Sequence, residues 1–270
     1  MSKAIDLLII GRGRVGRSLG RAFRRAQRSV RIWSGRAFMA NPLPSLPPAS
    51  VIWITVSDPH IEAVSRHLAS ALGKAGFLPS IAHASGALPP SVLWACRERG
   101  APIAAAHPCL SFGSARTPLK GGVFVLDGDP HAIDALSRLI LDLEGKPIIK
   151  GIHGPRYHAA LALAANGSGA LAALASSALE AMGFTPPESR AILSGLLHSL
   201  ALNIRRMGPA EALTGPIARG DVQTLARHIE SLEGPDRNDY LAVSRLILRA
   251  ALLRGLSQDA HSAIASLLEP

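Results

Sequence analysis

The feature that most constrains the fold is an apolar run that leads directly into a glycine-rich turn. Leu7–Ile10 precedes Gly-Arg-Gly-Arg-Val-Gly, and a helical pattern follows. In a strand-turn-helix unit that binds a dinucleotide, the first glycine makes the tight turn, the second admits the pyrophosphate and the third packs helix against strand. The alternative is a plain glycine turn, but the position between strand and helix favours a dinucleotide site. Its predicted residues are Gly11, Gly13, Arg14, Val15 and Gly16.

The end of the next strand indicates which dinucleotide is bound. The pattern predicts this strand over Ser29–Trp33, and Ser34 and Arg36 follow it. An NAD enzyme places a carboxylate here for the ribose hydroxyls, yet no Asp or Glu occurs between Asp6 and Asp58. A hydroxyl and a guanidinium suit a 2′-phosphate, so Ser34 and Arg36 predict NADP(H), the alternative being that Arg36 is only a loop residue.

The positive charge is concentrated near the amino terminus. The net charge is +10, and residues 1–36 hold ten Lys or Arg against one acid. A nucleic-acid-binding protein could show such a stripe, but no interleaved aromatic residues, zinc pattern or helix-turn-helix signal accompanies it. We therefore expect no nucleic-acid partner, and a solvated surface that steers an anionic cofactor.

The cysteines and the apolar segments indicate the cellular compartment of the protein. Cys96 and Cys109 form no CxxC pattern and are expected to be reduced thiols in a cytoplasmic protein. The first apolar run is too short for a signal peptide. Residues 159–179 carry no charge, but Asn166 and several Gly and Ser interrupt them, which favours a buried helix in a soluble protein over a membrane span.

Strands alternate with helices through about residue 150, and only helices follow. Further strands are expected at 51–56, 80–83, 102–106, 123–126 and 147–150. This predicts an α/β fold, a doubly wound and mostly parallel Rossmann sheet over 1–152, followed by a smaller all-α domain over 153–270. The helices of that domain are expected at 155–182, 187–207, 221–232, 236–254 and 257–268.

Ligands of such a sheet bind at the carboxyl ends of its strands, where several polar groups gather. The predicted cofactor contacts there are Val56, Ser57 and Ser85. Asp58 is expected to cap the helix that Pro59 begins. His83 and His107 end two other strands.

Two stretches of the helical domain carry groups suited to chemistry. His158 and Asn166 lie two turns apart on one predicted helix, so both can border one cleft, although each can equally be a packed core residue. Thr214 and Arg219 lie in a loop that can hold a carboxylate, while Asp221 is expected to cap the next helix.

These residues together resemble a family of bacterial proteins that join a Rossmann-like NADP-binding domain to a helical domain of unknown function. The motifs that carry the resemblance are GRGRVG at 11–16, His-Ala-Ser-Gly-Ala-Leu at 83–88, His107-Pro108 with Phe112, Arg-Tyr-His-Ala-Ala at 156–160 with Asn166, and LTGPIARGD at 213–221 followed by His228. Such proteins are similar to pyrroline-5-carboxylate reductases and, more distantly, to 6-phosphogluconate and 3-hydroxyisobutyrate dehydrogenases. Some are assigned as an alternative ketopantoate reductase.

The resemblance implies a reductase that dimerises through its helical domain and passes hydride to a carbonyl or imine carbon held between the domains. His158 is then the first candidate for proton donor, with His107 as the competing acid. Asn166 would bind the substrate oxygen, and Arg156, Thr214 or Arg219 a carboxylate. Members often carry lysine in place of Arg156, and the Lys-x-x-x-Asn pair of the wider class has Ala162 in the lysine position.

The leading prediction is an NADP(H)-dependent, ketopantoate reductase-like enzyme. The alternatives are a pyrroline-5-carboxylate reductase-like imine reductase and a non-catalytic NADP(H)-binding sensor in which the histidines are structural. Metal-dependent hydrolysis would use His153 and His158, but no carboxylate or third ligand lies nearby, so no metal is expected.

Overall fold

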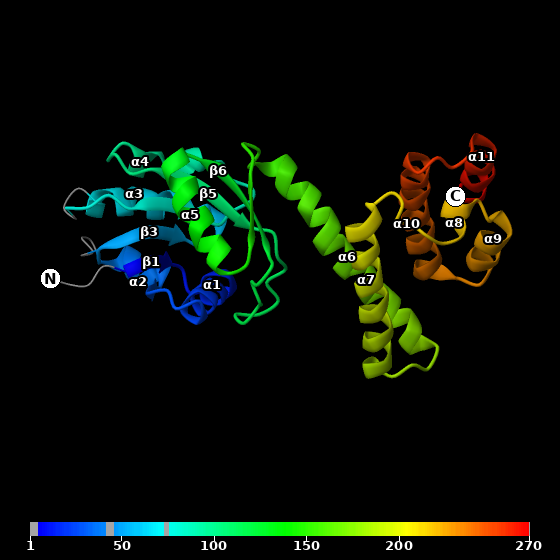
Figure 1. Ribbon diagram of the computed structural model, residues 1–270. Helices are drawn as coiled ribbons and strands as arrows, with labels where there is room; N and C mark the ends of the chain where they lie inside the picture. The colour runs from blue at the N-terminus through cyan, green and yellow to red at the C-terminus, as the bar shows by residue number, and fades with distance from the viewer. Residues whose placement is uncertain (1–4, 42–45, 73–75, 270) are drawn as a thin grey trace. The chain divides into compact units, whose positions relative to one another are not determined.

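A computed structural model describes residues 5–41, 46–72 and 76–269 of the chain (Figure 1). The chain divides into two compact units, residues 1–167 and 168–270. Each unit is described in turn.

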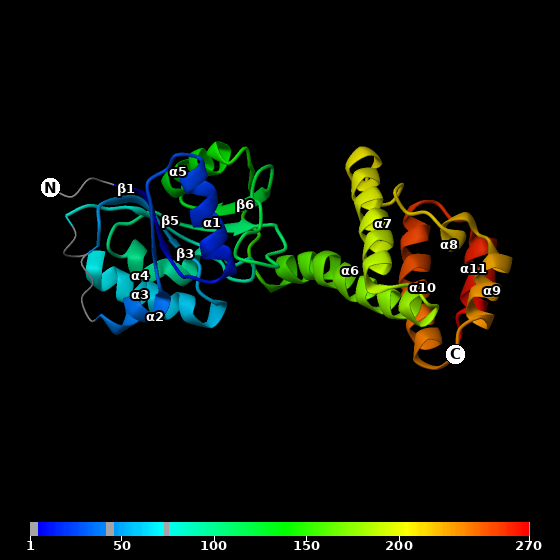
Figure 2. The ribbon, with the colours of Figure 1, turned by 90° about the horizontal axis from the view of Figure 1, so that it is seen from below.

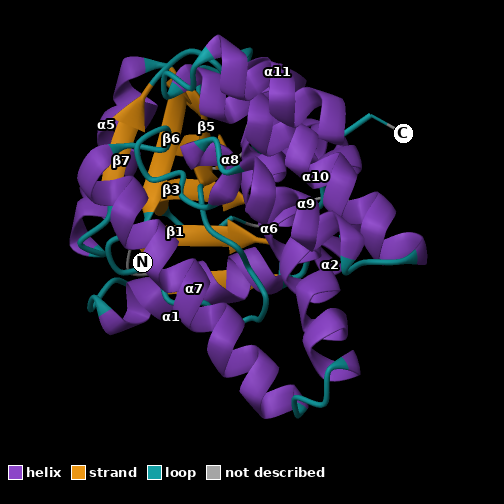
Figure 3. Ribbon diagram, turned by 90° about the vertical axis from the view of Figure 1, so that its right-hand side faces the viewer, coloured by secondary structure: helices purple, strands orange, loops and turns teal. Residues whose placement is uncertain are grey.

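The first unit is built on one seven-stranded sheet, drawn in orange in Figure 3. Its strand order is β2-β1-β3-β4-β5-β6-β7, and every pair is parallel except β5 with β6. The strands are β1 (Ile5–Ile10), β2 (Val30–Trp33), β3 (Ala49–Ile54), β4 (Ser80–His83), β5 (Ile103–Pro108), β6 (Val123–Gly128) and β7 (Lys146–Ile149). The predicted doubly wound, mostly parallel sheet is thus confirmed.

Helices cover both faces of this sheet, as Figure 2 shows. One face carries α1 (Arg14–Arg25) and α5 (Pro130–Asp142). The other carries α2 (Gly35–Ala40), α3 (Ile61–Leu72), the 3₁₀ turns Asp58–His60 and Pro90–Leu93, and α4 (Trp94–Arg97). Strand β1 is apolar at consecutive positions because Leu8 packs on one face and Leu7 on the other.

Several local predictions were wrong. The third strand was expected to reach Val56, but β3 ends at Ile54, and the Thr55 hydroxyl turns to donate to the Gly11 carbonyl at 3.3 Å. Asp58 is not a helix cap, because Ser57 holds the cap position and the Asp58 carboxylate is engaged elsewhere. The sequence pattern also predicts a helix from about Pro90 to Arg99, where the structure has a 3₁₀ turn and the short α4.

The second unit is helical, as predicted. Its helices are α7 (Pro186–Met207), α8 (Pro216–Arg219), α9 (Val222–Glu230), α10 (Gly234–Leu253) and α11 (Gln258–Leu267), and α6 (Pro155–Ala181) leads into it. Buried side chains of α8 to α11, such as Leu225, Leu248 and Ile264, form its core. Asp221 caps α9 by accepting from the Thr224 N–H at 3.0 Å, as predicted.

Helix α6 departs from expectation, because no described residue of it is buried within the chain. Alanine is the commonest residue of α6 and leucine the next, and one chain leaves the faces of this helix uncovered. By length and composition alone it is also long enough to cross a membrane, a criterion that helices of soluble proteins also meet.

Candidate functional site

The glycine-rich turn between β1 and α1 is shaped by its three glycines. Gly11 has φ +137°, and a Cβ atom there would overlap Thr55. A Cβ atom on Gly16 would overlap the Gly11 carbonyl oxygen and Thr55 Oγ1, whereas Gly13 has no atom within 4 Å of a built Cβ. Gly11 and Gly16 therefore allow close packing, and Gly13 leaves open space over the turn.

The amino terminus of α1 is available to an anion. Gly13 is its N-cap residue, no side chain caps it and no acid lies in its first turn. Unpaired N–H groups at a helix start attract phosphate. Val15 packs into the core beneath the turn, and the Arg14 guanidinium donates to the Phe112 carbonyl at 3.3 Å. The residues present thus fit a dinucleotide pyrophosphate.

The segments that follow β2 and β3 approach each other beyond the end of β1. A Cβ atom on Gly35 would stand 2.7 Å from Val56 Cγ1, which shows how closely they approach. Ser34 caps α2, where its hydroxyl accepts from the Ala37 N–H at 3.5 Å. Arg36 follows in the first turn of α2 and is exposed. Ser57 lies beyond β3, with its hydroxyl 2.9 Å from His60 Nδ1.

Arginine side chains line a groove of about 630 Å³ along α1. Its residues are Arg12, Arg17, Arg21, Arg24, Arg25, Gln27 and Ile32. No acid lines it, so it presents a positive potential beside the glycine-rich turn, where it would raise the local concentration of an anionic cofactor.

The loop after β4 is fixed by Ser85. Its hydroxyl donates to Asp58 Oδ2 at 2.8 Å and accepts from the N–H groups of Ala87 at 3.1 Å and Leu88 at 3.2 Å. Three hydrogen bonds use the whole capacity of a hydroxyl. A cofactor contact of Ser85, as predicted from the sequence, would have to replace one of them.

His83 is the fully buried imidazole of this loop. The Ser85 N–H donates to its Nδ1 at 3.2 Å, so Nε2 carries the proton and donates to the Pro89 carbonyl at 3.2 Å. Protonation of Nδ1 would destroy the Ser85 contact. Burial, above all, lowers the pKa of His83 from 6.5 to about 4.

We expect His83 to make the first unit sensitive to acid. Its neutral form is the folded one, so its contribution is complete above pH 6.5 and is lost as the pH falls toward 4. The loss amounts to about 3 kcal/mol of unfolding free energy. Urea unfolding of the wild type and His83→Gln at neutral pH and at pH ~4.5 measures it. The wild type should lose more stability than the variant, and equal losses would contradict this.

The carboxyl end of β5 brings together three polar side chains from two segments. His107 Nδ1 lies 3.1 Å from the Tyr157 hydroxyl, and Cys109 Sγ lies 3.3 Å from the same oxygen and 3.7 Å from His107 Nδ1. All three side chains are half-buried. Tyr157 is the third residue of α6, whose start is tied to the β4 loop by the Gly154 N–H donating to the Gly86 carbonyl at 3.2 Å.

Gly86 also sets the position of the His107 ring. A Cβ atom on Gly86 would stand 3.0 Å from Cε1, Nδ1 and Nε2 of His107, which places Gly86 over the ring face. The ring edge meets Tyr157 at a centroid distance of 5.8 Å and His158 at 6.2 Å. His107 is thus held from three sides.

Burial and two neighbouring histidines keep His107 neutral. Burial first, and then His153 and His158, lower its pKa to about 4, while Asp58 acts in the opposite direction. His153 is buried 3.8 Å from Asp127 and 5.4 Å, between centroids, from the Tyr157 ring. Burial raises the pKa of Tyr157, and its contact with Cys109 adds to this.

The predicted catalytic and substrate-binding residues belong to both units, and each unit is described by itself. His158 lies beside His107, but its own side chain is exposed. Arg156 and Asn166 are exposed on α6 of the first unit. Thr214 and Arg219 are exposed in the second unit, before and at the end of α8.

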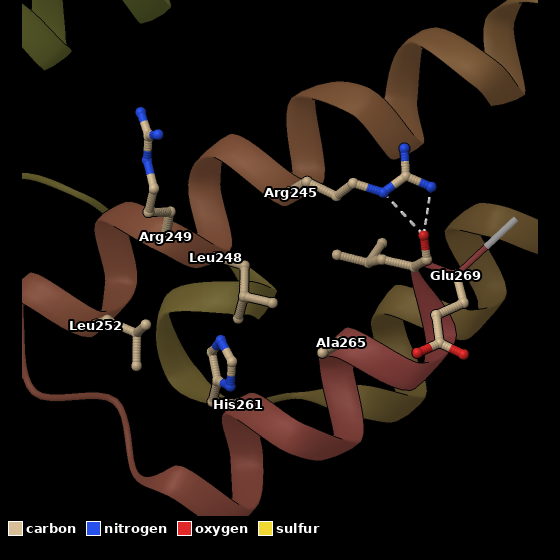
Figure 4. Close-up of a pocket in the computed structure, with 8 residues that line it drawn as sticks. Arg245, Leu248, Arg249, Leu252, His261, Ala265 and Glu269 are labelled. Carbon is tan, nitrogen blue, oxygen red and sulfur yellow. Dashed lines mark hydrogen bonds between the residues drawn. The ribbon is translucent and has the colours of Figure 1, made fainter.

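The second unit has a hollow of about 520 Å³ between α10 and α11 (Figure 4). Arg245 crosses one end of it and donates to the Leu268 carbonyl, which holds the end of the chain against α10. None of the residues predicted for the functional site lines this hollow. We attribute this hollow to the way α11 packs against α10.

Two residues of the β5 cluster, Cys109 and Tyr157, were not predicted as site residues. Each is adjacent in sequence to a motif that was singled out, since Cys109 follows His107-Pro108 and Tyr157 precedes His158. Among residues 5–41, 46–72 and 76–269, no group of three or more His, Cys, Asp or Glu is arranged to hold a metal ion.

Comparison with known proteins identifies one family model. The model of a domain of unknown function, DUF2520, matches residues 122–247, which run from β6 into α10. A search of the curated proteins finds no match.

Solved structures resemble the chain over almost its whole length. A provisional NADP oxidoreductase from Bacteroides fragilis, BF3122, is 19% identical with a TM-score of 0.67, covering 91% of this chain and 98% of its own. A reductive aminase from Aspergillus terreus in complex with NADPH and ethyl levulinate is 17% identical (TM-score 0.56; 98% and 99% covered). A pyrroline-5-carboxylate reductase from Coxiella burnetii is 13% identical (TM-score 0.55; 99% and 100% covered). At these identities the likeness establishes the fold.

Proposed function

We propose that this chain is an NADP(H)-dependent reductase of a small carbonyl acid, in the manner of a ketopantoate reductase. The observation that carries the proposal is the β1–α1 turn, where Gly16 packs on Gly11 and Thr55 beneath an uncapped helix start. This arrangement fits a pyrophosphate. The NADP oxidoreductase, the reductive aminase in complex with NADPH and the pyrroline-5-carboxylate reductase among the similar structures support the same class of reaction.

The bound cofactor would supply hydride, and the residues of the chain would bind the substrate and supply a proton. His107 is the donor that we favour, because it lies at the carboxyl end of β5 with its ring held by Gly86 and Tyr157. His158, the first candidate from the sequence, becomes the competing donor in this proposal because its side chain is exposed on α6. Asn166 would bind the substrate oxygen.

The substrate that we propose carries a carboxylate, which either Arg156, or Arg219 with Thr214, would bind. Both arginines are exposed, so neither is committed to a buried ion pair. A cyclic imine acid is the second candidate substrate, because a pyrroline-5-carboxylate reductase is among the similar structures.

The decisive experiment is NADPH oxidation with a panel of 2-oxo acids and cyclic imines. Turnover of ketopantoate or a related acid supports the proposal, and turnover of imines alone selects the second candidate. Tight NADPH binding without turnover of any compound would contradict both and favour a non-catalytic NADP(H) sensor.

We expect Arg36 to select NADPH over NADH. Arg36→Ala removes the guanidinium that faces the proposed 2′-phosphate, which costs about 2 kcal/mol, or about 30-fold in the Kd of NADPH. The Kd of NADH should stay constant, since it has no such phosphate. Arg31→Ala, an exposed arginine of β2, is the matched control. Fluorescence titration measures both constants, and an equal loss for both cofactors would contradict the assignment.

We further propose that α6 and α7 pack against a second copy of the chain in the cytoplasm. Leu163 and Leu196 are 70% and 63% exposed, and no residue of α6 is buried within the chain. A single chain thus leaves a large apolar surface, which soluble proteins normally cover. A second copy of the chain offers the same apolar surface, so packing of the two copies would cover both surfaces.

Light scattering at micromolar concentration should show a dimer, and Leu196→Glu should produce a folded monomer, because a carboxylate cannot be buried unpaired. Leu253→Glu, equally drastic but at the end of α10, should leave the dimer intact. A monomeric wild type, or one that sediments with membranes, would contradict this proposal.

A further inference from the structure

The cluster at the end of β5 defines which nitrogen of His107 carries the proton. Nδ1 lies 3.1 Å from the Tyr157 hydroxyl and 3.7 Å from Cys109 Sγ. A phenol is a stronger acid than a neutral imidazole, and sulfur is a weak acceptor. The favoured arrangement therefore has the Cys109 thiol donating to the Tyr157 oxygen and the Tyr157 hydroxyl donating to Nδ1. His107 then presents Nε2–H.

A neutral histidine can give up its Nε2 proton easily only if Nδ1 receives another. The low pKa of His107 means that its imidazolium form is scarce near neutral pH, so it has no spare proton of its own. Tyr157 is the hydroxyl placed to supply one. Because the pKa of Tyr157 is raised, its phenolate form is unfavourable, so Tyr157 needs a proton donor of its own. Cys109 Sγ lies 3.3 Å from the Tyr157 hydroxyl oxygen.

The geometry points to a proton relay from Cys109 through Tyr157 to His107, an inference that rests on the proposed reductase function. The bound cofactor would supply hydride to the substrate carbon. In the proton transfer the His107 Nε2–H bond breaks and an O–H or N–H bond forms on the substrate, the Tyr157 O–H bond breaks as Nδ1–H forms, and the Cys109 S–H bond breaks as the Tyr157 O–H is restored. After the product leaves, Nε2 takes a proton from water, the Nδ1 proton returns to Tyr157 and the Tyr157 proton returns to the thiolate, which restores the starting state.

The surroundings contain few other groups that can titrate with the relay. His153 lies against the Tyr157 ring, with Asp127 behind it at 3.8 Å. His158 meets the edge of the His107 ring, and Asp58 and His83 act on His107 and on each other from the ends of β3 and β4. Cys109 is half-buried, which leaves its thiol a route to water.

The first test needs no cofactor or substrate. In the free protein, nitrogen NMR of the histidine side chains should show His107 with its proton on Nε2. Tyr157→Phe should give a mixture of both tautomers. Tyr240→Phe removes a similar hydrogen bond, between the Tyr240 hydroxyl and His228 Nδ1 at 2.8 Å, and should leave the His107 signals unchanged. A wild-type His107 protonated on Nδ1, or unaffected by Tyr157→Phe, would overturn the relay.

The second test is turnover. Tyr157→Phe should lower kcat about 10- to 100-fold with the KM for substrate unchanged, which is the usual scale of a lost proton transfer. Cys109→Ala should lower kcat less, and Cys109→Ser should restore it, because a hydroxyl can donate in place of the thiol. Wild-type kcat in Tyr157→Phe would overturn the relay. If the wild type turns over no substrate, the reductase proposal fails, and the NMR result alone then decides the tautomer.

Discussion

Gly13→Val is expected to fold as stably as the wild type and to lose NADPH binding about 100-fold or more. Gly13 adopts φ −70° and ψ −171°, which valine tolerates, and a built Cβ meets no atom within 4 Å. The same open space is where the pyrophosphate would approach the backbone. Side-chain atoms there would cost about 3 kcal/mol of binding, which corresponds to the stated change in Kd.

Two matched variants separate binding from folding. Gly16→Ala forces a Cβ atom into the Gly11 carbonyl and Thr55, so it should lower the unfolding free energy by about 2 kcal/mol or more. Gly113→Ala, at another glycine with no atom near a built Cβ, should change neither property. Urea unfolding and fluorescence titration of NADPH give the two measurements. Full NADPH affinity in Gly13→Val would exclude a pyrophosphate from this turn.

The fold was predictable because its signals are local. Continuous apolar runs such as Leu7–Ile10 mark strands covered on both faces, and glycine, proline and cap residues mark where helices begin. The helix over Pro155–Ala181 was predicted within one residue for this reason. Its burial was not, because an alanine-rich segment without charges over residues 159–179 has the same composition whether its own chain or a second copy covers it.

The functional site was predictable from the sequence only where its residues lie close together along the chain. The roles of Gly11, Gly13 and Gly16 follow from their spacing, and the structure shows the packing that this spacing implies. Asp58 was misassigned as a cap because its partner, Ser85, is 27 residues away. The contact of Tyr157 with His107 spans 50 residues and depends on how α6 starts beside the β4 loop. No local pattern encodes such a pairing.

The second large effect that we expect shows whether His107 or His158 is the proton donor. His107→Ala should lower kcat about 10²- to 10⁴-fold, the range for a lost general acid, and leave the Kd of NADPH unchanged. His158→Ala should stay close to the wild type, because its exposed ring can be lost without moving the β5 cluster.

Gly86→Ala tests the role of His107 without replacing His107 itself. Its φ is not in the left-handed region, so the backbone tolerates alanine, but the new Cβ would stand 3.0 Å from three atoms of the His107 ring. The ring must shift by a few tenths of an ångström, and because proton transfer depends steeply on donor position, kcat should fall about tenfold. Single-turnover loss of NADPH absorbance would measure all three variants. A severe loss in His158→Ala with near-normal rates in His107→Ala and Gly86→Ala would transfer the role of proton donor from the end of β5 to α6.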